Sequence, residues 1–132
     1  MNKIKNLALI DDDDMFVFLT KKTIEYSNLV DVVKVFRNGR EAINFLNENS
    51  RNVEKLPEVI LLDLTMPIMD GWQFLEQYVL LKPNIGKKII IYIVSSSISP
   101  SDIERAKHIN EVTDYIIKPV TKEHLIEMLK NL

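Results

Sequence analysis

Short runs of apolar residues alternate with longer amphipathic stretches along the whole chain. Five runs have the length and the β-branched character of strands, and they lie at 7–10, 32–36, 59–62, 88–94 and 114–117. After each run, apolar residues recur at three- and four-residue steps, which is typical of helices that cover one face of a sheet. These helices are expected at 15–28, 42–46, 72–82, 99–109 and 121–132. The polar segment 47–55 has no periodicity, which indicates a surface loop or an extra helical turn.

The strand–helix order, repeated five times, indicates parallel strands that are joined by right-handed crossovers. The run 59–62 is apolar at every position, as in strands that are buried on both faces. We predict an α/β fold with a doubly wound, five-stranded parallel sheet, in the flavodoxin-like order 2-1-3-4-5 with helices on both faces. Five units are too few for an eight-unit barrel. Because no linker or repeat divides the sequence, we expect one domain over 1–132 and no output domain.

Composition narrows the class of protein. The 132 residues are 46% hydrophobic and 27% charged, which suits one globular domain with its own core. The net charge of −2 gives no electrostatic basis for binding nucleic acid. The absence of cysteine excludes disulfides, thiol catalysis and cysteine-based zinc sites. The apolar run that follows segment 1–6 is too short for a signal peptide, and no run is long enough to span a membrane. We therefore expect a cytoplasmic protein.

Four of the five predicted strands end on a polar group that can take part in chemistry. These groups are Asp11 with Asp12, Asp63, Ser95 and Lys118. In a parallel sheet of this order the first and third strands are neighbours, so the carboxylates of Asp11, Asp12 and Asp63 converge at one edge. Converging carboxylates repel one another unless a cation lies between them. Mg²⁺, which prefers oxygen ligands and keeps several waters, is the cofactor that this arrangement predicts.

These groups meet the needs of phosphoryl transfer, in which catalysis is mostly positioning and charge neutralisation. An ionised Asp63 would be the nucleophile, and Mg²⁺ would bridge its carboxylate and the incoming phosphoryl group. Ser95 and Lys118 would bind the remaining phosphoryl oxygens. No residue is placed as a general base for rapid hydrolysis, so we expect an aspartyl phosphate that persists long enough to signal.

Four sequence segments also match a known family. They are LIDD at 9–12, LLDLTMPIMDG at 61–71, IVSS at 93–96 and DYIIKP at 114–119. In this order, and over the whole chain, the sequence resembles the receiver domain of two-component response regulators, of the chemotaxis-type single-domain kind. The combination of all four segments at strand ends is far more specific than any one of them.

The resemblance implies a role for each matching residue. Asp63 would be the phospho-acceptor; Asp12 would bind Mg²⁺ directly, Asp11 through water, and the Thr65 backbone carbonyl would complete the site. Ser95 would be the switch hydroxyl and Lys118 the phosphate-binding lysine. The remaining assignments are Tyr115 as the aromatic switch and a cis peptide bond between Lys118 and Pro119.

We therefore expect a signalling module rather than an enzyme. A sensor histidine kinase or a histidine phosphotransfer protein would supply the phosphoryl group to Asp63 in a His-to-Asp phosphorelay. Phosphorylation would draw Ser95 and Tyr115 inward and reshape the surface around the fifth strand, as a population shift between two states. That surface would bind a downstream protein, and the same face would allow a homodimer.

Two other interpretations stay open at this point. One is a receiver-like interaction module that is not phosphorylated, against which the intact acid pair, Asp63 and Lys118 argue. The other is a Mg²⁺-dependent phosphatase with an Asp nucleophile, which needs a second acidic residue as acid/base. Asp70 is the only nearby candidate, and its place beside Gly71 indicates a turn or a helix cap.

Several polar residues at predicted helix starts are interpreted as caps rather than as site residues. Asp13 and Asp14 extend the acidic run into the first helix, where carboxylates are favoured. Ser99, which precedes a proline, and Thr121 are expected to cap the last two helices with their hydroxyls.

Overall fold

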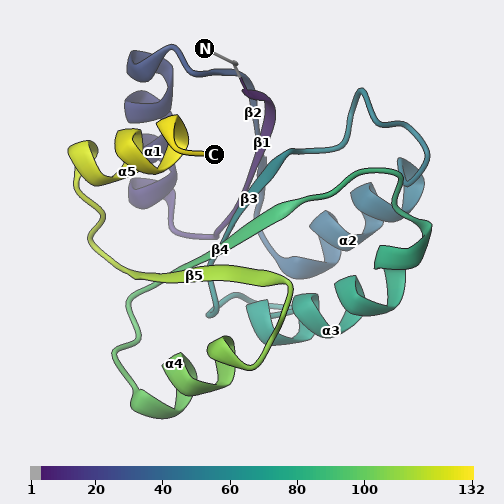
Figure 1. Cartoon of the computed structure of the whole chain (residues 1–132). Helices are drawn as coiled ribbons and strands as arrows, with labels where there is room; N and C mark the ends of the chain where they lie inside the picture. Colours follow the sequence, from purple (N-terminus) through teal and green to yellow (C-terminus); the bar gives the residue numbers. More distant parts are fainter. Residues whose placement is uncertain (1–3) are drawn as a thin grey trace.

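A computed structural model describes residues 4–132 of the chain (Figure 1). Residues 1–3, at the start of the segment from which the absence of a signal peptide was predicted, lie outside the described residues. In chain order the elements are β1 (Ile4–Ile10), α1 (Asp14–Ser27), β2 (Val30–Phe36), α2 (Gly39–Glu48), β3 (Val59–Leu62), α3 (Gly71–Leu81), the 3₁₀ turn η1 (Lys82–Asn84), β4 (Ile90–Ser95), α4 (Pro100–Lys107), β5 (Val112–Ile117) and α5 (Lys122–Lys130).

The five strands form one parallel sheet in the order β2-β1-β3-β4-β5. Helices α1 and α5 pack side by side on one face, and α2 and α3 pack together on the other (Figure 1). The predicted fold class and strand order are therefore confirmed. The strand order changes direction between β1 and β3, because β2 is added on one side of β1 and β3, β4 and β5 follow on the other. The carboxyl ends of β1 and β3 therefore border the crevice where ligands bind in such sheets. Within residues 4–132 no helix is long and apolar enough to cross a membrane.

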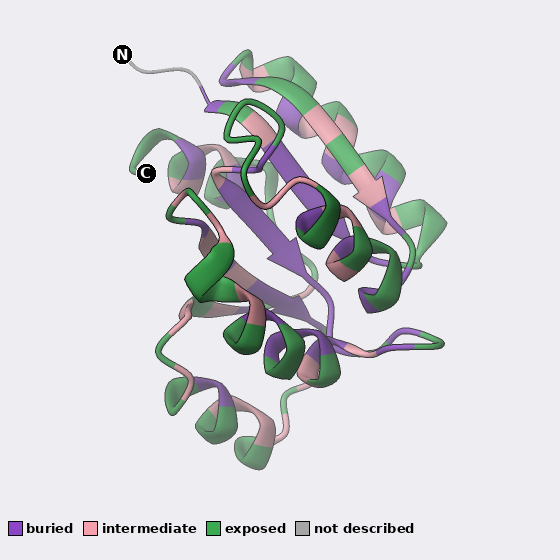
Figure 2. Cartoon of the chain, turned by 90° about the vertical axis from the view of Figure 1, so that its right-hand side faces the viewer, coloured by how far each residue is buried: buried purple, intermediate pink, exposed green. Residues whose placement is uncertain are grey.

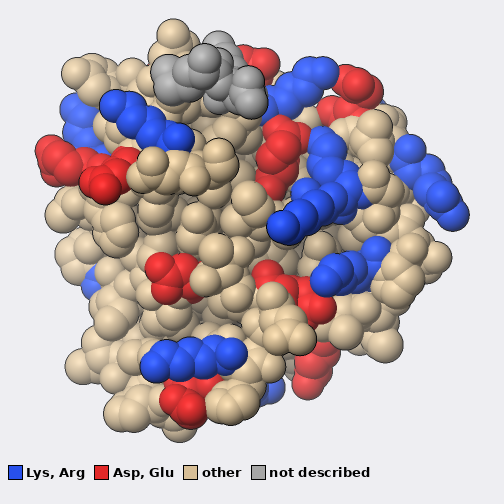
Figure 3. All heavy atoms as spheres, in the orientation of Figure 1, with Lys and Arg blue, Asp and Glu red and all other residues tan. Residues whose placement is uncertain are grey.

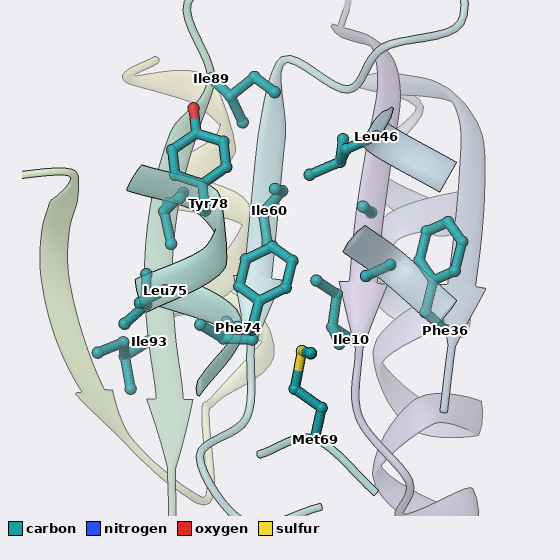
Figure 4. Packing of buried hydrophobic residues seen from close by; sticks show 14 of the residues in the cluster. Ile10, Phe36, Leu46, Ile60, Met69, Phe74, Leu75, Tyr78, Ile89 and Ile93 are labelled. Carbon is teal, nitrogen blue, oxygen red and sulfur yellow. The ribbon is translucent and has the colours of Figure 1, made fainter. Parts of the chain in front are cut away.

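Both faces of the central strand are covered, and all four residues of β3 are buried (Figure 2). Successive side chains point to opposite faces. Ile60 and Leu62 enter the core on the α2–α3 side. Figure 4 shows this core, with Ile60 near Phe74 of α3. Val59 and Leu61 enter the smaller core under α1 and α5. Each such side chain contributes about 1.5–3 kcal/mol on burial, so the strand that leads into Asp63 is firmly held.

The strand boundaries differ from those predicted at the amino-terminal edge of the sheet. β1 begins at Ile4 rather than at position 7, because Ile4 pairs with Val30 and its N–H donates to the Leu29 carbonyl (2.7 Å). β5 begins at Val112 rather than at 114, and β4 covers Ile90–Ser95 rather than 88–94. Backbone pairing with a neighbouring strand, which the apolar pattern does not report, sets these boundaries. The polar segment after α2 forms consecutive turns, with the Asn52 N–H on the Asn49 carbonyl (2.8 Å).

The helix starts follow the predicted caps with one exception. The Asp13 carboxylate accepts the N–H groups of Met15 and Phe16 (3.1 and 3.2 Å), and Thr121 accepts the His124 N–H (3.1 Å). For Ser99 the predicted position is confirmed, and the predicted hydrogen bond of its hydroxyl is wrong. Ser99 occupies the N-cap position of α4, but its hydroxyl is 2.9 Å from the hydroxyl of Ser101 instead of accepting a helix N–H.

The loop between β3 and α3 contains one residue in an unfavourable backbone conformation. Ile68 has a φ of 68°, and the Met69 N–H donates across it to the Pro67 carbonyl (2.7 Å). This is a three-residue turn of the strained γ type. A positive φ is unusual for a β-branched residue, and such strain costs about 1–3 kcal/mol.

Contacts on both sides hold this loop in place. The Gly39 N–H donates to the Met69 carbonyl (2.8 Å), and a Cβ at Gly39 would lie only 2.9 Å from both that oxygen and the Met69 Cγ. The Gly71 N–H donates to the Leu64 carbonyl (3.0 Å). Glycine is required at both positions because of the close approach of the backbone, not because of a positive φ.

Candidate functional site

The register of β1 and β3 brings two buried carboxylates side by side at the carboxyl edge of the sheet. Ile10 pairs with Leu62, and Asp11 and Asp63 are the next residues along their strands. The Asp63 N–H donates to the Ile10 carbonyl (2.9 Å), which ties the two strand ends together. Asp11 is 1% exposed and Asp63 is 7% exposed. Carboxylates are seldom buried to this extent unless a partner compensates their charge.

Asp12 completes an acidic cluster with these two residues. One carboxylate oxygen from each of Asp11, Asp12 and Asp63 lies within 4.8 Å of the others, with Asp12 exposed to solvent. Hard divalent cations such as Mg²⁺ prefer this donor set, and the exposed side leaves room for the waters that the ion retains. The three residues present therefore fit the ion that the sequence predicts.

Burial raises the pKa of Asp63 to about 6, and the neighbouring charge of Asp11 adds to this rise. The Lys118 ammonium and the backbone N–H groups of Thr65 and Leu64 act in the opposite direction. Burial also raises the pKa of Asp11, against the Asp13 N–H and Lys118. Nearby donors and one lysine therefore do not fully offset the burial of two negative charges, and a cation would.

Lys118 is the only ammonium that the structure places against this cluster among the described residues. Its Nζ is 2.9 Å from Asp11 Oδ2 and 3.8 Å from Asp63 Oδ1. It also lies over the Phe16 ring, 4.2 Å from the centroid. The sequence predicted the lysine but not Phe16, whose position in an amphipathic pattern indicated only core packing. A cation–π contact at a partly desolvated site stabilises by about 1–2 kcal/mol, so Phe16 helps to orient the lysine.

The two predicted switch residues meet at the backbone of Ser97. Ser95 is 1% exposed, and its hydroxyl accepts the Ser97 N–H (3.1 Å). The half-buried Tyr115 donates its hydroxyl to the Ser97 carbonyl (2.9 Å). The Ser97 hydroxyl in turn donates to Asp102 of α4 (2.6 Å). Ser97 therefore connects the end of β4 with β5 and with α4. Nothing in the sequence singled out Ser97 for this role among the three consecutive serines.

The other acidic residues near the site have structural partners. Asp14 pairs with Arg37, and Asp70 forms a capping box with Gln73, in which each side chain accepts a backbone N–H of the other (2.8 and 2.9 Å). The interpretation of Asp70 as a helix cap is confirmed. The peptide bond between Lys118 and Pro119 is cis.

Some charged side chains away from the site form ion pairs. On the face shown in Figure 3, lysine and arginine side chains lie among acidic ones. Among the described residues, Lys82 pairs with Glu111 (3.3 Å) and Lys87 pairs with Glu58 (2.5 Å).

Comparison with known proteins agrees with this geometry. The family profile for the response regulator receiver domain matches residues 7–130. The chemotaxis protein CheY of Listeria monocytogenes is 30% identical over 122 residues, which are 92% of this chain and 93% of that protein. A crystal structure of a two-component response regulator from Cytophaga hutchinsonii superposes with a TM-score of 0.84 at 30% identity, covering 99% of this chain and 100% of that one.

Some relatives are much longer than this chain. The sensor histidine kinase CheAY of Helicobacter pylori is 33% identical over 93 residues, which are 70% of this chain and 11% of that protein. Receiver domains are signalling modules that histidine kinases phosphorylate and that bind Mg²⁺ in an acidic pocket. The profile match over nearly the whole chain, together with the fold and the acidic cluster, shows that the chain belongs to the response regulator receiver domain family.

Proposed function

We propose that Asp63 accepts a phosphoryl group from a sensor histidine kinase or a histidine phosphotransfer protein, with Mg²⁺ as cofactor. Phosphorylation of Asp63 then switches a protein-binding surface, and the protein acts in the cytoplasm. The observation that carries this proposal is the meeting of the Asp11, Asp12 and Asp63 carboxylates within 4.8 Å. Lys118 lies against the same cluster, 2.9 Å from Asp11. This combination supports phosphoryl transfer because that reaction depends chiefly on charge neutralisation and positioning.

Asp63 provides the nucleophile for the transfer. Since burial raises its pKa only to about 6, most of its carboxylate is ionised at pH 7. One carboxylate oxygen forms a bond to phosphorus while the N–P bond to the donor imidazole breaks, and a donor ring that is protonated on its other nitrogen leaves as neutral imidazole with the N–P electron pair. Asp11, Asp12, Asp63 and the Thr65 carbonyl would hold Mg²⁺, which when bound neutralises charge on the phosphoryl oxygens.

Lys118 and Ser95 would bind the transferred group. The Lys118 ammonium rests on Asp11, and a phosphoryl group on Asp63 would compete for it with stronger acceptor oxygens. The Ser95 hydroxyl accepts the Ser97 N–H, and it donates to no group of the described residues, so its proton is available for a phosphoryl oxygen. Both side chains stabilise charge that appears on the phosphoryl oxygens during transfer.

Ser97 provides a route from this event to the surface. A Ser95 hydroxyl that turns toward the phosphoryl group would disturb its bond with the Ser97 N–H, and Ser97 also holds Tyr115 and Asp102. Tyr115 and α4 would then respond together. The downstream protein, or a second copy of the chain, would bind at the face around β5, where Ile117 is 43% exposed.

Mass spectrometry of the intact protein tests the proposal. The protein is incubated with acetyl phosphate and Mg²⁺, and we expect an adduct of about 80 Da, the mass of one phosphoryl group on a carboxylate. Asp63→Asn should show no adduct. The matched control is Asp70→Asn, which changes a carboxylate seven residues away that serves only as a helix cap, and it should be labelled like the wild type.

The two other interpretations give different results. A receiver-like interaction module would show no adduct with acetyl phosphate or with any phosphorylated kinase. A phosphatase would release inorganic phosphate rapidly without accumulating the adduct, and Asp70→Asn would slow that release if Asp70 were its acid/base residue.

A further inference from the structure

Ile68 combines an unfavourable backbone conformation with an exposed apolar side chain. Its φ is 68°, and its side chain is among the most exposed large apolar ones of the described residues, at 76%. Glycine or asparagine would adopt the same conformation with less strain. Because the Ile68 side chain is exposed, its packing within the chain offsets little of this strain.

The shape of the loop does not depend on the Ile68 side chain. Met69, the next residue, is buried in the core, and its carbonyl accepts the Gly39 N–H (2.8 Å). On the far side, the Gly71 N–H bonds to the Leu64 carbonyl (3.0 Å), and Asp70 caps α3. These contacts fix the loop at both ends, so the backbone at position 68 faces outward independently of the side chain that it carries. Backbone strain that is retained without a gain inside the chain indicates that the Ile68 side chain contacts another molecule.

The place of the loop identifies the partner. The loop starts at Asp63, which is 7% exposed, so a donor protein must settle against the surrounding loops to bring phosphorus to about 3–3.5 Å from the carboxylate. Met15, in the first turn of α1, is 67% exposed and follows the exposed acids Asp12, Asp13 and Asp14, of which Asp14 is paired with Arg37. The rim of the site thus combines exposed apolar side chains with negative charge. Its complement is an apolar patch beside basic residues.

We propose that the Ile68 side chain is an apolar anchor for the phosphoryl donor protein, and that it inserts into an apolar patch next to the donor's phosphohistidine. This inference rests on the proposed function and adds to it the residue that favours a protein donor over a small one. An anchor of this kind near the centre of an interface accounts for at least a tenfold difference in binding.

Phosphotransfer kinetics with two kinds of donor test the inference. Histidine kinases of the source organism are purified and autophosphorylated, and the one that labels the wild type fastest is used for all variants. Ile68→Asn keeps the positive φ but removes the apolar surface, and its kcat/KM with this kinase should fall about tenfold or more. Its rate with acetyl phosphate should stay within about twofold of the wild-type rate. Ile68→Leu should recover most of the kinase rate, since it restores the apolar surface.

A matched control and the contrary outcomes complete the test. Leu80→Asn removes an equally apolar side chain that is 72% exposed on α3, and it should leave both rates unchanged. An unchanged kinase rate in Ile68→Asn would overturn the inference, as would an equal loss with both donors, because that would place the effect in the chemistry or in the loop shape. Failure of the proposed function is distinct, since the wild type would then accept phosphate from neither donor.

Discussion

One carboxylate lies at each end of β3, and the fold shifts the pKa values of the two in opposite directions. Glu58 precedes Val59, and Asp63 follows Leu62. Glu58 accepts the backbone N–H groups of Lys5 and Asn6 (2.7 and 2.9 Å) and pairs with Lys87 (2.5 Å). Although burial alone would raise the pKa of Glu58, Lys87 and these two N–H groups lower it. The pKa of Asp63 is instead raised to about 6.

The difference lies in the neighbours rather than in the type of group. The lysine nearest to Asp63 is 3.8 Å away and is shared with a second buried carboxylate, Asp11. Glu58 has a lysine in direct contact and two N–H donors on one oxygen. The charge of Glu58 is thus satisfied within the fold and stabilises it. The charge of Asp63 is left partly unsatisfied, which keeps it available to a cation and to a phosphoryl group.

The largest expected effect concerns phosphorylation. Asp63→Asn should abolish labelling from both acetyl phosphate and the kinase, because the amide is not a nucleophile. Glu58→Gln, at the other end of the same strand, should retain the wild-type rate. Autoradiography with a labelled kinase measures both variants in one experiment, and equal losses in the two would show that the two ends are not functionally distinct.

The second effect is a gain in stability. At pH 7 without Mg²⁺, Asp63→Asn should raise the free energy of unfolding by up to about 3 kcal/mol, since the raised pKa reflects an unfavourable buried charge. The folded state of the wild type holds a proton on Asp63 below pH 6 that the unfolded state releases near pH 4. The penalty is therefore absent below about pH 4, grows between pH 4 and 6, and is complete above pH 6. Urea unfolding at pH 4.5 and 7 measures this trend, and a constant difference would contradict it.

Glu58→Gln should have the opposite effect, a loss of about 1–2 kcal/mol at pH 7, because it weakens hydrogen bonds to a charged group. Since the pKa of Glu58 is lowered in the fold, this loss should be present above the ordinary glutamate pKa and fade as the pH falls below it. The same urea titrations provide the measurement. A stabilised variant would show that Glu58, like Asp63, is held at a cost.

Mg²⁺ should act on only one of the two ends. At ten times its dissociation constant it should stabilise the wild type by about 1.4 kcal/mol through binding to the native state alone. The melting temperature with and without EDTA measures the gain. Glu58→Gln should keep the full gain, and Asp63→Asn should lose most of it, because a carboxylate ligand is missing. An equal gain in Asp63→Asn would place the ion elsewhere.

The smallest effect concerns the strained turn, which has no counterpart at the Glu58 end. Ile68→Gly should raise the free energy of unfolding by about 1 kcal/mol, because release of about 1–3 kcal/mol of strain exceeds the entropy that glycine loses on folding. Calorimetry measures this change. Destabilisation would show that the isoleucine side chain supports the loop after all.

The sequence was sufficient for the parts of the molecule that depend on periodicity and strand order. Asp11 and Asp63 could be placed together because each directly follows an apolar strand, and parallel pairing brings such positions to one edge. Lys118 and Ser95 followed by the same reasoning. The roles of these residues remain predictions that the experiments above address.

Other features depend on contacts that no local pattern reports. Glu58 is one polar residue before an apolar run, and its partners Lys5 and Lys87 come from distant segments. The contact between Phe16 and Lys118 depends on a rotamer and on the meeting of α1 with the end of β5. A β-branched residue such as Ile68 rarely adopts a positive φ, so the sequence alone predicts a negative φ there. Tertiary contacts, rather than local propensity, decide all three.

The bond between Gly39 and Met69 has a practical consequence. The Gly39 amide belongs to the start of α2, after the edge strand β2, yet its hydrogen-bond acceptor lies in the loop that leaves Asp63. Its proton can exchange with solvent deuterium only when that bond opens. The exchange rate at Gly39 is therefore a built-in gauge of loop opening, one that can be read by NMR without placing any label near the acidic cluster.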